Sequence, residues 1–448
     1  MLYYYPVFSS ILTRSRAETE TGMSRLALTD SDKQARDWFA DTVSELGCKV
    51  EVDEMGNQFA IRLEYFFSTE ARILIIVTRP GQKEGPPTCA GSHLDTQPTG
   101  GRYDGILGVT AAVEMLRVLK EEKVETQYPV GVINWTNEEG ARFPMSMVSS
   151  GVWAGEIPLE KAHNLPSVTR GDSSTMLSEL KRIGSLGKTP CSHEAMPIAA
   201  HFELHIEQGP HLESENKKVA IVEGVQSYRW YTITVKGRDC HTGTTGLYQR
   251  ADAMLAASKM ILASREIAHK LGALASTGII DAKPGSTNTV PGHVTFSLDI
   301  RAKKNEVVYE AERVMQEEFA RIAAGQSTQY LPSLTREAHP DVCSVDWQLD
   351  VDSPATNFHP DCIQCVTDAA GDLFGDDVSK LTRRIVSGAG HDSVYTSKRV
   401  PTSMIFVPSK NGISHNPLEY TSPEDCAIGA QVLMGAVLNY DNLRAQRA

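Results

Sequence analysis

The sequence lacks any apolar run that approaches the roughly 20 residues a helix needs to span a bilayer. It also lacks an excess of basic residues, because 44 Lys and Arg stand against 56 Asp and Glu, a formal net charge of −12. Nucleic acids and anionic membranes repel such a chain, so we expect neither as a partner. A small anionic substrate is not excluded, since the local charge of a site decides what it binds.

Cysteine shows no paired pattern, and the eight cysteines are scattered along the chain. We recognise no secretory signal, so we expect reduced thiols and a cytoplasmic protein. Residues 1–20 faintly resemble a transit peptide, and a targeting segment there is the alternative. Cys362 and Cys365 have the spacing of a redox or zinc pair. Because no second pair accompanies them, a helix with two buried thiols is the favoured interpretation.

The length of 448 residues suits two or three domains, and the first part of the chain reads as an α/β sheet. Apolar periodicity predicts helices over residues 31–46 and 108–122, with buried strands before and after the second helix. Ligands of such sheets gather beyond the carboxyl ends of the strands. His93 and the pair Glu138 and Glu139 follow two of these strands directly.

From residue 228 the order of elements changes to β-α-β-β-α-β. This split βαβ pattern is typical of a ferredoxin-like α+β domain, with four strands and two helices on one face. We therefore expect a catalytic domain in two parts, residues 1–226 and 351–448, and an inserted domain over residues 227–350.

The α/β part carries imidazoles and carboxylates on loops and at the ends of elements: His93, Asp95, Asp104, Glu138, Glu139, His205, His391, Asp392 and His415. A mixed set of this kind suits zinc or manganese better than calcium, which prefers oxygen ligands. Of two adjacent glutamates, one can be a ligand while the other takes a proton from metal-bound water. Each motif alone is explained as well by a capped strand end or a solvated turn, so the hypothesis depends on the whole set.

A series of segments, taken in order, resembles one family. They are Gly91–Val109, Asn134–Gly155, Leu204–Pro210 (LHIEQGP), Cys240–Gly246 (CHTGTTG), Gly285–Gly292 (GSTNTVPG), Ser387–Ser393 (SGAGHDS) and Ile413–Glu419 (ISHNPLE). They resemble the carbamoylase branch of the dinuclear zinc peptidase and amidohydrolase superfamily. That branch includes N-carbamoyl-L-amino-acid hydrolases, the yeast-type β-ureidopropionase (β-alanine synthase), and allantoate and ureidoglycolate amidohydrolases. The likeness covers nearly the whole chain from Thr21.

The resemblance implies a zinc-peptidase-like α/β catalytic domain that holds two divalent ions per subunit, zinc first, with manganese, nickel or cobalt as alternatives. His93 and His205 would hold one ion, Glu139 and His415 the other, and Asp104 would bridge them. The peptidase branches usually place a carboxylate at the position of His205, so this residue favours the carbamoylase side.

The same resemblance assigns the catalytic groups. Glu138 would be the general base, and Asp95 would orient His93. The inserted domain would serve as a lid and as the dimerisation surface of a homodimer. Its His241 would reach the neighbouring subunit's site and stabilise negative charge on the carbonyl oxygen of the substrate.

The implied substrate is a small ureido acid with a carboxylate. Arg301 would grip that carboxylate with two parallel hydrogen bonds. Gln208, His241, Asn288 and the backbone at Gly390 would complete the substrate site. Taken singly, Arg301 is better explained by pairing with a surface acid, and Asn288 could belong to a turn.

Two stretches of the chain depart from the family pattern. Leu63–Thr78 looks like an insertion, either a lengthened hairpin at the sheet edge or sequence that is absent from the mature protein. Around His241, Cys240 and the run Gly246–Gln249 also differ from the residues usual in relatives.

The sequence therefore predicts a dinuclear, metal-dependent amidohydrolase that cleaves a linear C–N bond of N-carbamoyl-L-amino acids or ureido acids and releases ammonia and CO2. Allantoate or ureidoglycolate amidohydrolase is the alternative within the enzymes. From another class, an inactive, metal-poor relative could act as a binding subunit.

Overall fold

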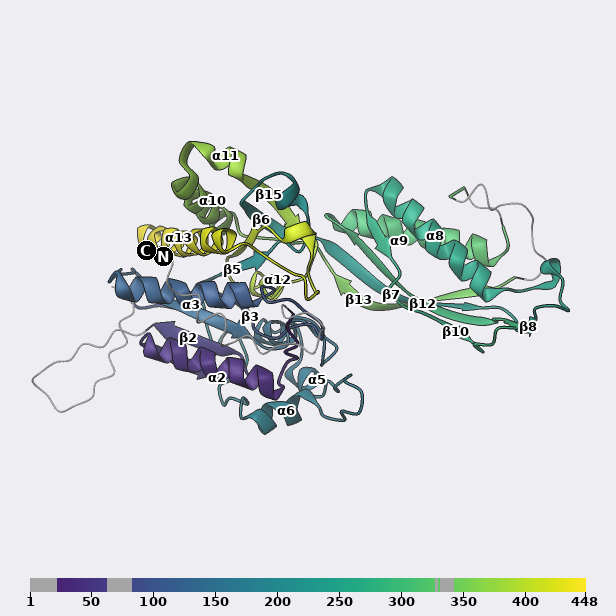
Figure 1. Cartoon of the computed structure of the whole chain (residues 1–448), viewed down its shortest axis with the longest axis horizontal. Helices are drawn as coiled ribbons and strands as arrows, with labels where there is room; N and C mark the ends of the chain where they lie inside the picture. The colour runs from purple at the N-terminus through teal and green to yellow at the C-terminus, as the bar shows by residue number, and fades with distance from the viewer. Residues whose placement is uncertain (1–21, 63–82, 327–328, 331–341) are drawn as a thin grey trace, which may run out of the picture. The chain divides into compact units, whose positions relative to one another are not determined.

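The computed structural model describes residues 22–62, 83–326, 329–330 and 342–448. The chain forms two compact units, one of Met1–Gly224 with Asn357–Ala448 and one of Val225–Thr356 (Figure 1). The second unit extends past residue 350 because strand β13 (Ser344–Ser353) continues beyond that position. The insertion Leu63–Thr78 and the N-terminal segment 1–20 lie outside the described residues.

The first unit is built on a nine-stranded mixed sheet in the order β1-β2-β4-β3-β5-β16-β6-β14, with β15 paired to β6. Its centre is parallel and consists of β4 (Val130–Trp135), β3 (Thr88–His93), β5 (Ala200–Ile206) and β16 (Thr402–Val407). Every residue of these four strands is buried. The outer strands are β1 (Cys48–Val52), β2 (Gln58–Arg62), β6 (Val219–Val225), β14 (Thr356–Asn357) and β15 (Thr382–Ser387).

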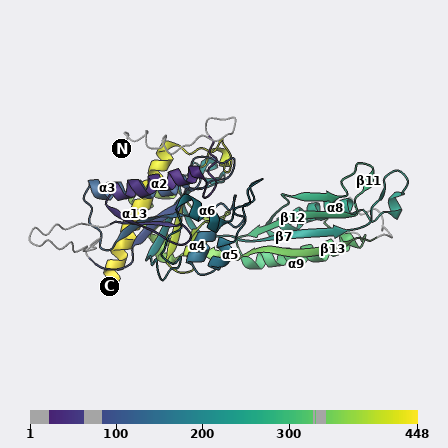
Figure 2. The ribbon, with the colours of Figure 1, turned by 90° about the horizontal axis from the view of Figure 1, so that it is seen from below.

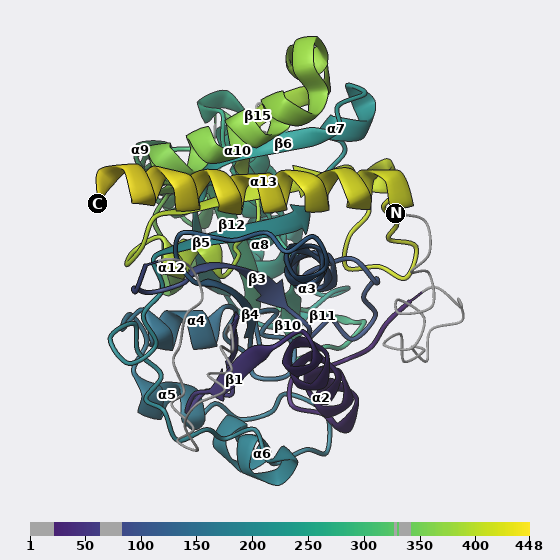
Figure 3. The ribbon, with the colours of Figure 1, turned by 90° about the vertical axis from the view of Figure 1, so that its left-hand side faces the viewer.

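Helices cover both faces of this sheet, which explains why its central strands have no solvated side (Figure 3). Neighbouring residues of one strand, such as Cys89 and Ala90 of β3, belong to two different apolar cores. One core contains α2 (Asp30–Glu45), α3 (Ile106–Glu121), α10 (Pro360–Phe374) and α13 (Pro423–Arg447). The other contains α4 (Val148–Trp153), α5 (Leu159–His163) and α6 (Met176–Ile183).

The α/β expectation is confirmed. Thr29 caps α2 by accepting a hydrogen bond from the backbone of Asp32. Cys362 and Cys365 are buried on α10, as the helical interpretation of their spacing required. The sequence did not predict the short helices α4 and α5, because each is too short to show a periodic apolar pattern. Among the described residues, no helix is both long and apolar enough to cross a membrane.

The second unit contains a five-stranded antiparallel sheet in the order β10-β12-β7-β13, with β9 paired to β12. Its strands β12, β7 and β13 are labelled in Figure 2. Its elements are β7 (Ser227–Lys236), α8 (Ala253–Leu271), β9 (Leu274–Ser276), β10 (Ile280–Lys283), β12 (His293–Ala302), α9 (Asn305–Ala323) and β13. Burial alternates along β12, since only its inward side chains pack against α8 and α9. The expected β-α-β-β-α-β order has four strands, and the short β9 adds a fifth to the sheet. A two-stranded ribbon of β8 (Cys240–His241) and β11 (Thr289–Val290) is a further addition.

Candidate metal centre and active site

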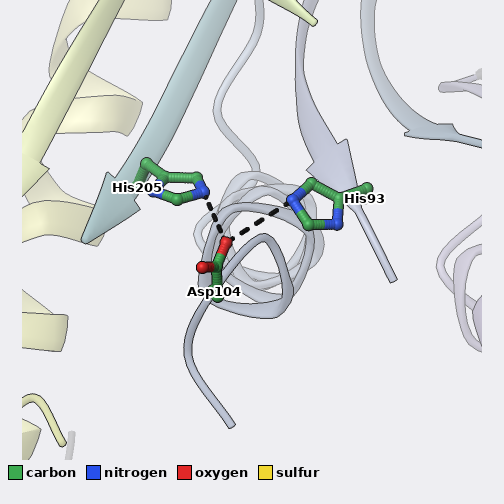
Figure 4. Close-up of side chains that lie close together, drawn as sticks. All are labelled: His93, Asp104 and His205. Carbon is green, nitrogen blue, oxygen red and sulfur yellow. Dashed lines mark ion pairs between the residues drawn. The ribbon is translucent and has the colours of Figure 1, made fainter. Parts of the chain in front are cut away.

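His93, Asp104 and His205 form the centre of the candidate site (Figure 4). His93 ends β3 and His205 lies near the end of β5, so two adjacent parallel strands bring their imidazoles to the same edge. Asp104 lies on the loop before α3, and its Oδ1 is 3.0 Å from His205 Nε2 and 3.7 Å from His93 Nε2. Gly105 allows this approach, because a Cβ there would lie 2.3 Å from the His93 ring.

A second group shares Asp104. The other carboxylate oxygen of Asp104, Oδ2, is 3.4 Å from His415 Nε2, which is 3.5 Å from Glu139 Oε2. In each of the two groups, the nitrogen and oxygen atoms lie within 4.8 Å of one another. The structure therefore brings the expected ligands together around one aspartate, which faces each group with one oxygen.

The hydrogen bonds behind the rings fix where the imidazole lone pairs point. His93 Nδ1 lies 2.9 Å from the backbone oxygen of Asp95, and His205 Nδ1 lies 2.9 Å from that of Ile206. Because a carbonyl only accepts, both Nδ1 atoms carry protons, and a neutral ring then presents its Nε2 lone pair to Asp104. Two lone pairs that face a carboxylate need a cation between them. Without a metal that cation is a proton, and Asp104 accordingly raises the pKa of His205 to about 9 against the effect of burial.

The residues present fit divalent metal ions. His93 Nε2 is buried and has no hydrogen-bond partner, as expected of an atom placed to bind a metal. Imidazoles and carboxylates in this mixture suit zinc and manganese. Burial and the neighbouring Asp104 raise the pKa of Glu139 to about 8, so a cation at this position would stabilise its ionised form.

Asp95 contacts His93 differently from the expectation. His93 Nδ1 donates its hydrogen bond to the backbone oxygen of Asp95, whereas the Asp95 carboxylate stays 4.0 Å from the ring. That carboxylate instead accepts the backbone N–H groups of Glu138, at 3.2 Å, and Glu139, at 3.3 Å. Asp95 thus holds the turn that carries both glutamates, and burial raises its pKa to about 7.

Glu138 has the surroundings of a general base. Its Oε2 lies 3.5 Å from His93 Nε2, and its side chain is buried. Burial, with Asp392 and Glu139 nearby, raises the pKa of Glu138 well above its ordinary value, so the carboxylate accepts a proton readily. Asn137 precedes it with a left-handed φ of 56°, a conformation that is uncommon outside glycine.

Gln208, which we expected to contact substrate, lies inside the cluster. Its Nε2 donates to Asp104 Oδ2 at 2.8 Å and to Ser414 Oγ at 3.1 Å. Gln208 and His415 have left-handed φ angles of 57° and 54°. Together with Asn137, these strained residues gather at the candidate site, as strained backbone often does at functional sites.

Two buried glutamates escaped the sequence interpretation as site residues. Glu419 accepts the backbone N–H groups of Tyr103 and Asp104 and thereby holds the Asp104 loop. Glu203 lies on β5 and forms a third close group with His205 and His391. A charged residue inside the apolar strand AHFELHI was the available signal for Glu203. Glu419 gave no such signal, because an acid on a loop is ordinary.

His391 and Gly390 lie at the edge of this cluster. The His391 ring is buried and meets the His205 ring edge-on, with 4.6 Å between centroids. Gly390, directly before it, is half-buried. The backbone at Gly390, which we expected to contact substrate, therefore lies next to His391, whose ring packs against that of the candidate ligand His205.

His241 and Asn288 belong to the second unit, and both are exposed. The ribbon brings them together, since His241 pairs with Thr289 and the backbone of Thr242 donates to the Asn288 carbonyl at 3.0 Å. The backbone N–H of Gly243 donates to His241 Nδ1 at 3.0 Å. A neutral His241 ring consequently carries its proton on Nε2, where it can donate a hydrogen bond.

Arg301 also belongs to the second unit and is half-buried. Its Nε and Nη2 donate to the carboxylate of Asp299 at 3.0 and 2.8 Å. The guanidinium also stacks over Tyr228, 4.9 Å from the ring centroid. These contacts hold its planar group in one orientation.

The site lies at the ends of parallel strands in an α/β sheet, and its imidazoles and carboxylates surround one aspartate. This arrangement is typical of hydrolases that activate water. Comparison with known proteins specifies the family. The model of Peptidase family M20/M25/M40 matches residues 89–439. The chain therefore belongs to this family.

The similar proteins include amidohydrolases. The chain is 37% identical over 424 residues to an N-carbamoyl-L-amino-acid amidohydrolase of Rhizobium meliloti, covering 93% of this chain and 91% of that one. It is 31% identical over 427 residues to an allantoate amidohydrolase of Bacillus subtilis, covering 94% and 93%. A crystal structure of an amidase of the hydantoinase/carbamoylase family from Burkholderia multivorans matches with a TM-score of 0.79 and 37% identity, covering 96% and 95%. The predicted family is confirmed, and the chain is a hydrolase of carbon–nitrogen bonds other than peptide bonds.

Proposed function

We propose that the chain hydrolyses N-carbamoyl-L-amino acids or closely related ureido acids. The observation that carries the proposal is the set of Nε2 lone pairs from His93 and His205 facing Asp104, with Glu138 beside them. Two relatives that are 37% and 32% identical in sequence are named N-carbamoyl-L-amino-acid amidohydrolases. The water oxygen would bond to the carbamoyl carbon, the C–N bond to the terminal nitrogen would break, and ammonia would leave. The remaining carbamate would then lose CO2.

His93, His205, Asp104, Glu139 and His415 would hold two divalent ions, zinc first, with manganese, nickel or cobalt as alternatives. When bound, such ions supply Lewis acidity that lowers the pKa of water and polarises a carbonyl. Glu138 would take the proton from the attacking water and hand it to the departing nitrogen. Asp95 would keep Glu138 and Glu139 in place through their backbone N–H groups.

The second unit would supply the groups that recognise substrate, and would act as a lid and as the contact of a homodimer. His241 Nε2–H would donate to the carbonyl oxygen across the dimer interface as negative charge develops there. Arg301 would bind the substrate carboxylate with its planar fork, helped by Asn288. In the first unit, Gln208 and the backbone at Gly390 would complete the substrate site. A cytoplasmic location is part of the proposal, supported by eight free cysteines.

A substrate panel on purified, metal-reconstituted protein tests the function. Ammonia release from N-carbamoyl-L-α-amino acids or N-carbamoyl-β-alanine supports the proposal. Release from allantoate alone would move the assignment to the alternative, which the 31% identical allantoate amidohydrolase favours. Ureidoglycolate extends the panel to the other alternative. The same panel on protein without residues 63–78 shows whether that insertion matters to activity.

Metal content of the same samples separates the remaining outcomes. If no substrate releases ammonia although two ions are bound per chain, the natural substrate is another linear amide. If no substrate releases ammonia and no ion is bound, the result supports a metal-poor binding subunit and contradicts the proposed mechanism.

A further inference from the structure

Glu203 is a fully buried carboxylate on β5 that the proposed mechanism does not use. Its Oε1 accepts the hydroxyl of Ser92 at 2.7 Å, and its Oε2 accepts the hydroxyl of Ser393 at 2.6 Å. A buried charge without partners would destabilise the fold strongly. Here each oxygen has a hydroxyl donor, so the strand can retain a glutamate in its apolar surroundings.

The direction of the hydrogen bonds around Glu203 can be assigned from Trp135. The indole Nε1–H only donates, and it lies 3.4 Å from His201 Nε2. The proton of a neutral His201 is therefore on Nδ1, which faces Ser393 Oγ at 3.4 Å. Ser393 Oγ accepts from His201 and gives its own proton to Glu203. The chain of donors thus ends at the Glu203 carboxylate.

The two serines belong to segments that carry candidate site residues. Ser92 directly precedes His93 at the end of β3, and Ser393 begins α12 (Ser393–Thr396), two residues after His391. Glu203 itself is two residues before His205 on β5. One carboxylate therefore joins three segments that are far apart in the sequence.

Glu203 lies close enough to His205 and His391 to be considered a metal ligand. Both of its oxygens, however, are already occupied by short hydroxyl hydrogen bonds. His205 also directs its Nε2 to Asp104, while His391 Nε2 lies 3.0 Å from Ser387 Oγ. Because of these contacts, we treat Glu203 as a residue that supports the candidate ligands and not as a ligand itself.

We propose that Glu203 is a positioning residue of the metal centre: its carboxylate fixes β3, β5 and α12 to one another and so holds His93 and His205 in register. This inference rests on the proposed function, because it takes these histidines to be ligands. Groups that orient metal ligands typically change metal affinity roughly 10–100-fold when they are mutated.

The decisive substitution is Glu203→Gln, which has nearly the same shape. An amide has one oxygen, so its NH2 group must face one of the two serine hydroxyls that now donate to the carboxylate. We expect the zinc affinity of the full chain, measured by competition with a chromogenic chelator, to fall roughly 10–100-fold. Ser92→Ala and Ser393→Ala each remove one anchor and are expected to show smaller losses of the same kind.

A coupling measurement separates positioning from simple destabilisation. If Ser393 acts through Glu203, the double variant Glu203→Gln with Ser393→Ala binds zinc no more weakly than Glu203→Gln alone. Ser403→Ala is the matched control, since Ser403 is equally buried but donates to the backbone oxygen of Val222 on the neighbouring strand. We expect its zinc affinity to equal that of the wild type.

The inference is overturned if the wild type binds zinc and Glu203→Gln binds it equally well. It is also overturned if the losses of zinc affinity in Glu203→Gln and Ser393→Ala simply add in the double variant. Should Glu203→Gln fail to fold, the serine variants decide, provided that their metal-free melting temperatures match that of Ser403→Ala. Unchanged zinc affinity in both serine variants would then overturn it. A wild-type chain that binds no zinc would contradict the proposed function itself, which distinguishes the two failures.

Discussion

The two units hold their candidate site residues in different surroundings. In the first unit, Asp104 and Glu138 are buried, with relative exposures of 4% and 7%, and each lies within 4 Å of a histidine nitrogen. In the second unit, His241 and Asn288 are exposed and Arg301 is half-buried. Burial strengthens every charge interaction and shifts pKa values, whereas exposed groups gain their full strength only when a ligand displaces water. The comparison supports the proposed roles, in which buried groups of the first unit break the bond and more exposed groups of the second unit contact the substrate.

The largest effect expected from this comparison is at Glu138. Glu138→Gln keeps the volume of the side chain but removes the proton acceptor, so kcat should fall by roughly 10²–10⁴-fold or more. Both metals should remain, because the expected ligands are untouched. Steady-state kinetics with elemental analysis measures both quantities. Glu114→Gln, an exposed acid on α3, is the control, and near-normal turnover of Glu138→Gln would remove the residue from the mechanism.

Removal of metal should affect the first unit selectively. Ions that bind only the folded state stabilise it, by about 2.7 kcal/mol at a free concentration of 100 times Kd. Dialysis against a chelator should therefore abolish turnover and lower the melting temperature, and zinc should restore both. His93→Ala should have the melting temperature of the chelator-treated wild type, and zinc should raise it less than it raises that of the wild type. Turnover that survives complete removal of metal would contradict the metal centre.

In the second unit, Arg301→Lys should raise KM more than it lowers kcat. A lysine ammonium cannot reproduce two parallel hydrogen bonds to a carboxylate, and charge-assisted bonds contribute about 1.5–3 kcal/mol, roughly 10–100-fold. Arg229→Lys is a matched control on the same sheet, since Arg229 also pairs with acids, Glu312 and Asp352, and stacks over Tyr309. An unchanged KM for Arg301→Lys on a carboxylate substrate would exclude Arg301 from substrate binding.

The sequence could predict which residues of the first unit come together, because several of them lie at the ends of strands whose pattern is strongly apolar. His93 ends β3 and Glu139 lies on the loop after β4, so the parallel pairing of these strands brings both to the same edge of the sheet. Helix α2 was equally readable, since Thr29 and Asp32 form its cap locally.

The positioning groups could not be predicted in this way, because their partners are distant in the chain. Glu419 meets Tyr103 across 316 residues, and Glu203 meets Ser393 across 190. The contacts of the Asp95 carboxylate could not be predicted for a related reason. The backbone oxygen of Asp95 accepts the hydrogen bond of its sequence neighbour His93, while its carboxylate faces Glu138 and Glu139 on another loop. No periodicity reports which of several nearby groups a side chain will face.

The smallest expected effect is a loss of stability in the second unit that leaves the metal centre unchanged. Asp252 caps α8 by accepting the backbone N–H of Leu255 at 2.9 Å, and Asp252→Ala should cost about 1 kcal/mol. Amide exchange in the first turn of α8 should become faster, while zinc affinity stays at the wild-type value because the ligands belong to the other unit. Asp281→Ala, an exposed acid on β10 of the same unit, is the control and should leave exchange unchanged. Weaker zinc binding in Asp252→Ala would show that the second unit supports the metal centre, and the division of labour between the units would then fail.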